Sequence, residues 1–285
     1  MTSNLLAQLE TAQQALEPDF KALRQALAAL KRASKLAAEE RLDAIAMQKA
    51  LVKLQEADAL VDDEALHRAT TAFAETTQQA LDALAFDFAR DLKASFENRG
   101  LTVEGRPPTL VVGDLVLRID SAARKAQWFY GKEPLTRPLP LSLHAIIKAY
   151  DQQYKAIVLR EIDVAAFVGE LYDAWNQLIA ARSRRPAGGR INIIEVYSKV
   201  VLNRQSKRFW NAPSRKTFKD YERPFFVRDM VLAQAAPVVH RDGRAYHLRL
   251  GVATKNQASN PQRSVWLPKS PLDGDYYADL TFEAV

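Results

Sequence analysis

The 285-residue chain contains no cysteine, which excludes disulfide bonds, thiolate nucleophiles and cysteine-ligated zinc. It also lacks any apolar run close to the ~18 residues that a membrane span requires. The first residues, MTSNLLAQLETAQ, have neither the basic start nor the apolar stretch of a signal peptide. We therefore expect a soluble, cytoplasmic protein with no membrane contact.

Four widespread catalytic and cofactor motifs are missing: G-x4-G-K-[ST], G-x-G-x-x-G, G-x-S-x-G and H-E-x-x-H. They would mark P-loop nucleotide hydrolysis, dinucleotide binding, a hydrolase nucleophile elbow and a zinc peptidase centre. Their absence leaves these four classes unsupported. We therefore expect no catalytic residues, no cofactor and no resident metal.

Histidine is scarce, and two of the four histidines flank a turn. Asp242-Gly243 predicts a two-residue β-hairpin, in which residue 240 pairs with 245 and 238 with 247. His240 and His247 would then share a face about 7–8 Å apart. No third ligand is evident, so we interpret them as a surface pair rather than a metal site.

Residues 2–99 contain 24 alanines, no glycine and one proline, Pro18, which we expect in the first turn of a helix. Apolar residues at helical spacing predict a helical hairpin, bundle or coiled coil. Two rows follow this spacing: Phe20, Leu23, Leu27 and Leu30, then Leu81, Leu84, Phe88 and Leu92. We expect the second row to be buried. Such helices bury their apolar faces on each other, on a second copy or on a partner protein.

The rest of the chain predicts a mixed fold. Residues of about 109–130 are rich in β-branched and aromatic side chains and predict a small β-hairpin insert in a helical unit spanning 1–181. The basic segment RSRRPAGGR, 182–190, predicts a linker. Residues 191–285 predict basic helices followed by antiparallel strands. The fold class is thus α+β and predominantly α-helical.

Positive charge is concentrated in one segment. Residues 182–228 carry 13 Lys and Arg against three Asp and Glu, whereas residues 1–100 carry 12 against 16. Such asymmetry indicates a polyanionic partner, because cations neutralise phosphates and release their counterions. Aromatic residues between the cations could stack on exposed bases. The candidate nucleic-acid-binding residues are Arg184, Arg185, Arg190, Lys199, Arg204, Lys207, Arg208, Trp210, Arg215, Lys216, Lys219, Arg223 and Arg228.

These patterns favour a non-catalytic subunit of a larger assembly that binds DNA or RNA through residues 182–228. Two alternatives stay open: a scaffold whose basic face binds an acidic protein, and a metal-dependent nuclease using Asp220, Glu222 and Asp229. The order of helix, short helix, helix and hairpin after residue 190 also matches a winged helix, whose recognition helix would be 224–233.

Overall fold

The computed structural model describes residues 2–39 and 42–285, which form two compact units. The N-terminal unit contains the residues up to Ser95 with Arg106–Pro108 and Ile119–Lys125, and the C-terminal unit contains the rest. The fold is predominantly helical with two antiparallel sheets, so the predicted α+β class is confirmed. Within the described ranges, no helix combines the length and apolarity that crossing a bilayer requires.

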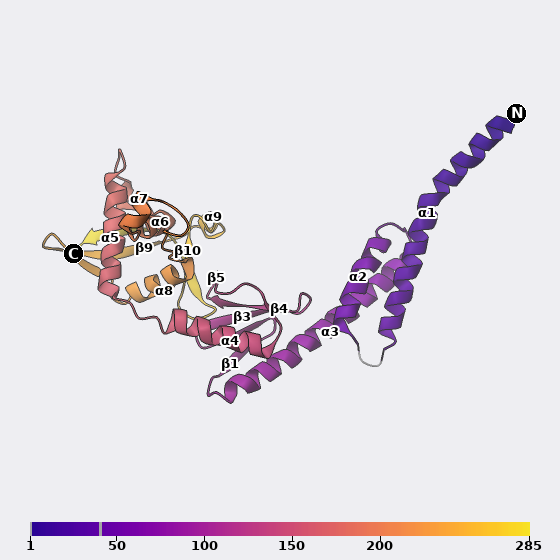
Figure 1. Ribbon diagram of the computed structural model, residues 1–285, viewed down its shortest axis with the longest axis horizontal. Coiled ribbons are helices and arrows are strands. Elements are labelled where there is room, and N and C mark those ends of the chain that lie inside the picture. Colours follow the sequence, from indigo (N-terminus) through magenta and orange to yellow (C-terminus); the bar gives the residue numbers. More distant parts are fainter. Residues whose placement is uncertain (1, 40–41) are drawn as a thin grey trace. The chain divides into compact units, whose positions relative to one another are not determined.

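Three helices build the N-terminal unit: α1 (Thr2–Ala37), α2 (Ala44–Asp58) and α3 (Glu64–Glu97) (Figure 1). The Asp43 side chain starts α2 by accepting hydrogen bonds from the backbone amides of Ile45 and Ala46, at 3.1 and 3.0 Å. The core shared by the three helices is rich in alanine and consists of Ala26, Ala29, Ala33, Leu36, Met47, Ala50, Leu51, Leu54, Ala57, Leu66 and Phe73.

The row containing Phe20, Leu23 and Leu27 does not enter the core of this unit, because these side chains are 66%, 51% and 58% exposed. Smaller alanines on a neighbouring face of α1 pack against α2 instead. Pro18 does not start a helix but lies inside α1, where its ring removes one backbone hydrogen bond. Leu30 is half-buried at the edge of the core.

The expected core row of α3 is confirmed in part. Leu81 and Leu92 are buried, at 3% and 0% exposure. Leu84 and Phe88 are half-buried. Between them, Ala85 and Ala89 are buried, so the buried face of this half of α3 passes through alanines as well as the larger residues.

The C-terminal unit begins with a small antiparallel sheet in the strand order β1-β2-β3-β4-β5, with β6 paired to β4. Its strands are β1 (Val103–Arg106), β2 (Thr109–Val112), β3 (Leu115–Asp120), β4 (Lys125–Tyr130), β5 (Glu133–Pro134) and β6 (Leu139–Pro140). Strands β2 to β4 lie at 109–130, where β structure was predicted, but they belong to a sheet of six strands and not to a lone hairpin. Trp128 is fully buried, with its ring centroid 6.5 Å from that of Phe96 and 5.2 Å from that of Tyr150.

Helices and a second antiparallel sheet complete this unit. The elements are α4 (Leu143–Gln153), the π-helix η1 (Tyr154–Val158), α5 (Val164–Ala180), η2 (Ala187–Gly189), β7 (Ile191–Asn192), α6 (Ile193–Asn203), α7 (Lys207–Asn211), α8 (Arg223–Ala233), β8 (Val238–Arg241), β9 (Arg244–Val252), α9 (Lys255–Ala258), β10 (Val265–Pro268) and β11 (Gly274–Ala284). The sheet order is β10-β11-β9-β8, with β7 on β11. His240 pairs with Ala245 across the Asp242-Gly243 turn, which confirms the predicted hairpin register.

The end of the basic stretch 182–190 is bonded to α5 and β11. The Trp175 indole donates a hydrogen bond to the Gly189 carbonyl at 2.7 Å, and the Thr281 hydroxyl donates one to the Gly188 carbonyl at 2.9 Å. Helix α5 also packs on α6 and β8. The contacts therefore divide the chain near residue 95, and α5 belongs with residues 191–285. A first proteolytic cut within 182–190 stays a prediction.

Leu54 provides a test of the N-terminal core, because it is 1% exposed. Replacing Leu54 by Ala should lower the unfolding free energy by about 2–5 kcal/mol, because it leaves a cavity that the surrounding side chains fill only in part. Urea unfolding followed by far-UV circular dichroism measures this loss. The control Leu60→Ala changes a side chain that is 62% exposed and should cost no more than about 0.5 kcal/mol. Equal losses for the two variants would contradict this core.

Candidate nucleic-acid interface

The structure separates the predicted binding residues into cations that hold the fold together and cations that are free to meet a ligand. Four arginines of the predicted set have structural partners: Arg190 with Asp279, Arg204 with Glu170, Arg223 with Glu133, and Arg228 with Tyr130 and the Val158 carbonyl. The sequence analysis predicted that all four arginines bind nucleic acid. Carboxylates partly neutralise the charges of Arg190, Arg204 and Arg223, whereas Arg228 is held by two neutral acceptors.

Arg204 belongs to a network that connects α5, α6 and α8. Its guanidinium bonds the Glu170 carboxylate at 2.7 Å and lies 3.8 Å above the centre of the Tyr221 ring. The Tyr221 hydroxyl donates to Asp229 at 2.7 Å, and Asp229 also accepts from the Arg160 guanidinium at 3.1 Å. Burial and the neighbouring Asp229 carboxylate raise the pKa of Tyr221, so its hydroxyl remains a donor at neutral pH.

Arg223 and Arg228 are both half-buried and cross-link distant parts of the C-terminal unit. Arg223 donates to the Glu133 carboxylate at 2.9 Å and to the carbonyls of Pro261 and Ser264. Arg228 donates to the Tyr130 hydroxyl and to the Val158 carbonyl, both at 3.2 Å. A planar guanidinium suits such multiple contacts, because its five donors point in fixed directions.

The free cations gather in residues 206–219, which we call the basic loop. The basic loop contains α7 and five cations but no Asp or Glu: Lys207, Arg208, Arg215, Lys216 and Lys219. All five are exposed, and none has a side-chain partner within residues 2–39 and 42–285. Arg184 and Arg185 are exposed in the separate 182–190 stretch, and Lys199 is half-buried on α6.

Gln205 closes the base of the basic loop. This side chain is 7% exposed, and its amide donates to the carbonyls of Val201 and Lys219 at 2.7 and 2.9 Å. Its carbonyl oxygen accepts from the Lys219 amide at 2.8 Å. The two ends of the loop are thereby tied together. Inside the loop, the rings of Phe209 and Phe218 pack edge to face with their centroids 5.5 Å apart. This contact joins the two halves of the loop that carry the cations.

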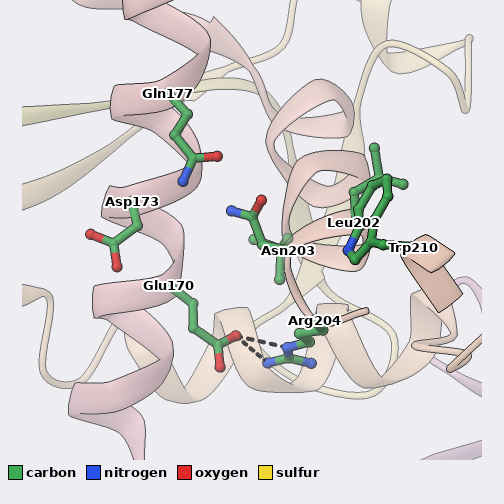
Figure 2. A pocket seen from close by; sticks show the side chains of 8 residues that line it. Glu170, Asp173, Gln177, Leu202, Asn203, Arg204 and Trp210 are labelled. Atoms are coloured by element: carbon green, nitrogen blue, oxygen red, sulfur yellow. Dashed lines mark hydrogen bonds and ion pairs between the residues drawn. The ribbon is translucent and has the colours of Figure 1, made fainter. Parts of the chain in front are cut away.

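Trp210 projects from α7 at the side of a cleft of about 520 Å³ between α5 and α6. The indole is 56% exposed, so Trp210 is not a core residue. Figure 2 shows Glu170, Asp173 and Gln177 along α5, with Asn203, Arg204 and Trp210 on the other side. The side-chain amides of Gln177 and Asn203 have no hydrogen-bond partner among the residues that the structure describes.

Two carboxylates line the same cleft, but each has a cationic neighbour. Glu170 is bonded to Arg204, and Asp173 accepts two hydrogen bonds from Arg241, each at 3.3 Å. The cleft therefore combines an exposed indole, two free amides and two partly neutralised carboxylates. These are the groups that bind a flat, polar heterocycle: a π-face for stacking and donors and acceptors for its edges.

Sequence reasoning missed Gln205, Gln177, Asn203 and Asp173. Asp173, Gln177 and Asn203 are polar residues on α5 and α6, and no spacing or charge run distinguishes them from a solvated helix face. Only Gln205 has a nearby feature in the sequence that could have drawn attention to it, because the cation-rich run without any acid begins two residues later. Its function as a clamp depends on Lys219, fourteen residues later, and appears only in the folded chain.

The winged-helix interpretation does not fit this arrangement. Phe226, Val227, Met230 and Ala233 of α8 are fully buried, and Arg228 is bonded inside the fold. The helix is therefore a core element of the unit and not an exposed recognition helix. Strands β7, β10 and β11 also extend the hairpin into a larger sheet.

The carboxylates proposed for the nuclease alternative are not gathered into one site. Asp229 is fully buried in the network with Tyr221 and Arg160, whereas Asp220 and Glu222 are exposed. Within the described ranges, no three His, Asp or Glu side chains are grouped as metal ligands would be, and this holds around His240 and His247.

Comparison with known proteins yields no relative: no protein-family model matches the chain, and neither a curated protein nor a solved structure is significantly similar to it.

The Gln205 clamp can be tested by proteolysis. Replacing Gln205 by Ala removes three hydrogen bonds of a buried side chain and should raise the rate of tryptic cleavage after Lys207, Arg208, Arg215 or Lys216 about tenfold. Mass spectrometry of the first fragments measures the rate. Gln234→Ala is the control, because Gln234 is exposed at the C-cap of α8 and its side chain makes no described hydrogen bond. An unchanged rate for Gln205→Ala would show that the loop is held by other contacts.

Proposed function

We propose that this protein binds single-stranded nucleic acid through the basic loop, with a base stacked on Trp210. The observation that carries the proposal is the conjunction of five unpaired cations and an exposed indole on one short, clamped segment. Phosphates bind the cations and release counterions, while the indole supplies a stacking surface that accepts any base.

The cleft favours an unpaired strand over a duplex. A base can stack on Trp210 only when its face is exposed, which a duplex prevents at all but its ends. The free amides of Gln177 and Asn203 lie on the walls of the same cleft, where they can bond the edge of a base. In contrast, α8 is embedded in the core and offers no helix for a major groove.

The arrangement of charges also indicates which part of the strand lies on the basic loop and which part lies in the cleft. Glu170 and Asp173 would repel phosphates from the cleft, while the basic loop attracts them. We therefore expect the sugar-phosphate backbone to follow the loop and one base to enter the cleft, where the carboxylates can accept hydrogen bonds from an exocyclic amino group. An acidic protein partner would use the same cations but has no need of the exposed indole beside two free amides.

In this proposal the protein acts as a binding subunit rather than an enzyme. The residues assigned to binding are Lys207, Arg208, Trp210, Arg215, Lys216 and Lys219, with Arg184, Arg185 and Lys199 as outlying contacts. Arg190, Arg204, Arg223 and Arg228 support the fold and are removed from the set of primary phosphate contacts.

The phosphate contacts predict a salt-dependent affinity that specific variants weaken. Replacing Arg208, Arg215 and Lys216 together by Ala should flatten the slope of log K against log salt by about two units for a single strand. Fluorescence anisotropy with labelled single-stranded DNA, single-stranded RNA and duplex DNA measures this slope. The charge-matched control replaces Arg244, Lys255 and Arg263, which are also exposed in the C-terminal unit, and should keep the slope.

The stacking contact predicts a different effect. Trp210→Ala should weaken single-strand binding by about 1–3 kcal/mol and duplex binding by much less. Trp210→Phe retains an aromatic face and should recover part of the affinity. If the wild-type protein binds no nucleic acid at low salt, the proposal fails and binding of an acidic protein takes its place.

A further inference from the structure

Helix α1 carries a row of large apolar side chains that no residue within the described ranges covers. Its members are Leu6 (59% exposed), Leu9 (60%), Leu16 (67%), Phe20 (66%), Leu23 (51%) and Leu27 (58%). Soluble monomers rarely leave a contiguous apolar surface of this kind open to water. The alanine face of α1 that packs on α2 is a separate one, so α1 has two apolar faces of which one is occupied.

The exposed row has the spacing of a coiled-coil seam. From Leu6 to Leu27 the exposed row advances in steps of three and four residues, with Gln13 as its one polar member, and the half-buried Leu30 at the edge of the core continues the spacing. In heptad notation, the a positions are Leu6, Gln13, Phe20 and Leu27, and the d positions are Leu9, Leu16, Leu23 and Leu30. A strict alternation of this kind makes a narrow seam against another helix, whereas a helix lying on a globular core has a wider stripe.

The N-terminal half of α1 has no tertiary support inside the N-terminal unit. Figure 1 shows it extending beyond α2 and α3, and residues 5–21 are all exposed. An isolated helix of this length is marginal in water, and Pro18 weakens it further by removing a backbone hydrogen bond. Pro18 occupies an f position, opposite the seam, where it does not interfere with a partner helix. This half of α1 therefore requires a partner helix for stability.

The charges beside the seam identify the partner as a second copy. The e positions are acidic in the first half, Glu10 and Glu17, and basic in the second half, Arg24 and Lys31. When two copies of α1 run antiparallel, e positions face e positions. One alignment then places Glu10 opposite Lys31 of the second copy and Glu17 opposite its Arg24, and symmetry repeats both pairs.

The same alignment fits the seam. It places Phe20 opposite Leu23 of the second copy and Leu16 opposite its Leu27, with Gln13 facing Leu30 at either end. A parallel pair would set e positions against g positions, which are Leu5, Ala12, Asp19 and Ala26, and would provide opposite charges only between Asp19 and Arg24. An antiparallel alignment shifted by one heptad would place Glu17 against Glu17.

We propose that the protein forms a homodimer in which the α1 helices pair antiparallel over about residues 9–34, a length of about 39 Å. The dimer is symmetric, with its two-fold axis near the Phe20–Leu23 layer. This interaction uses the N-terminal unit alone and does not depend on the nucleic-acid-binding proposal for the C-terminal unit.

Sedimentation of the full-length protein over a range of concentrations tests the dimer. We expect a monomer–dimer equilibrium in the wild type and a dissociation constant raised more than about 100-fold in Leu16→Glu/Leu23→Glu, because four seam layers are lost. The control Val52→Glu/Leu60→Glu changes exposed apolar residues outside the seam and should keep the wild-type constant. A wild type that stays monomeric, or a dimer that the seam variant does not weaken, would overturn the proposal.

Charge reversal and cysteine pairing test the orientation. Glu10→Lys/Glu17→Lys should weaken the dimer about tenfold, and adding Arg24→Glu/Lys31→Glu should restore it, since the reversed pairs again match. Because the chain has no cysteine, introduced thiols report contacts directly. Oxidation should link Glu10→Cys in one copy to Lys31→Cys in the other, and should leave Leu9→Cys unlinked. Linkage of Leu9→Cys to itself would show a parallel pair and overturn the antiparallel arrangement.

Discussion

A single buried carboxylate, Asp229, fixes the arrangement on which the basic loop depends. It has no exposed surface, and an ionised carboxylate in such a place requires partners for its charge. Arg160 and Tyr221 provide them, and Arg204 covers the outer face of the Tyr221 ring. Because Tyr221 lies two residues after the end of the basic loop, this network determines where the chain returns to the core. The cations before it are left on the surface.

Local patterns in the sequence predicted what local interactions determine. Alanine-rich composition predicted the first three helices, and Asp242-Gly243 predicted the hairpin with the observed register. The charge run also located the basic segment. Which of its cations are free could not be read from the sequence, because the partners of Arg204 and Arg223 lie 34 and 90 residues away. Periodicity found the apolar row of α1, but it could not tell whether this chain covers it.

The two unoccupied surfaces call for different partners. The row on α1 is apolar with matched charges at its side, which fits a second copy of the same helix. The basic loop is rich in cations and carries one exposed aromatic ring, which fits a phosphate backbone with unpaired bases. A dimer would carry two such loops, and two linked sites raise the apparent affinity for any strand that reaches both.

The most direct test of the account is to map where a nucleic acid touches the protein. Single-stranded oligonucleotides containing 5-iodouracil would be crosslinked by ultraviolet light to the full-length protein, and the modified peptides identified by mass spectrometry. The account predicts crosslinks concentrated at Trp210 and the neighbouring residues of the basic loop, and their loss in Trp210→Ala. Crosslinks confined to other parts of the chain, with none in residues 206–219, would contradict it.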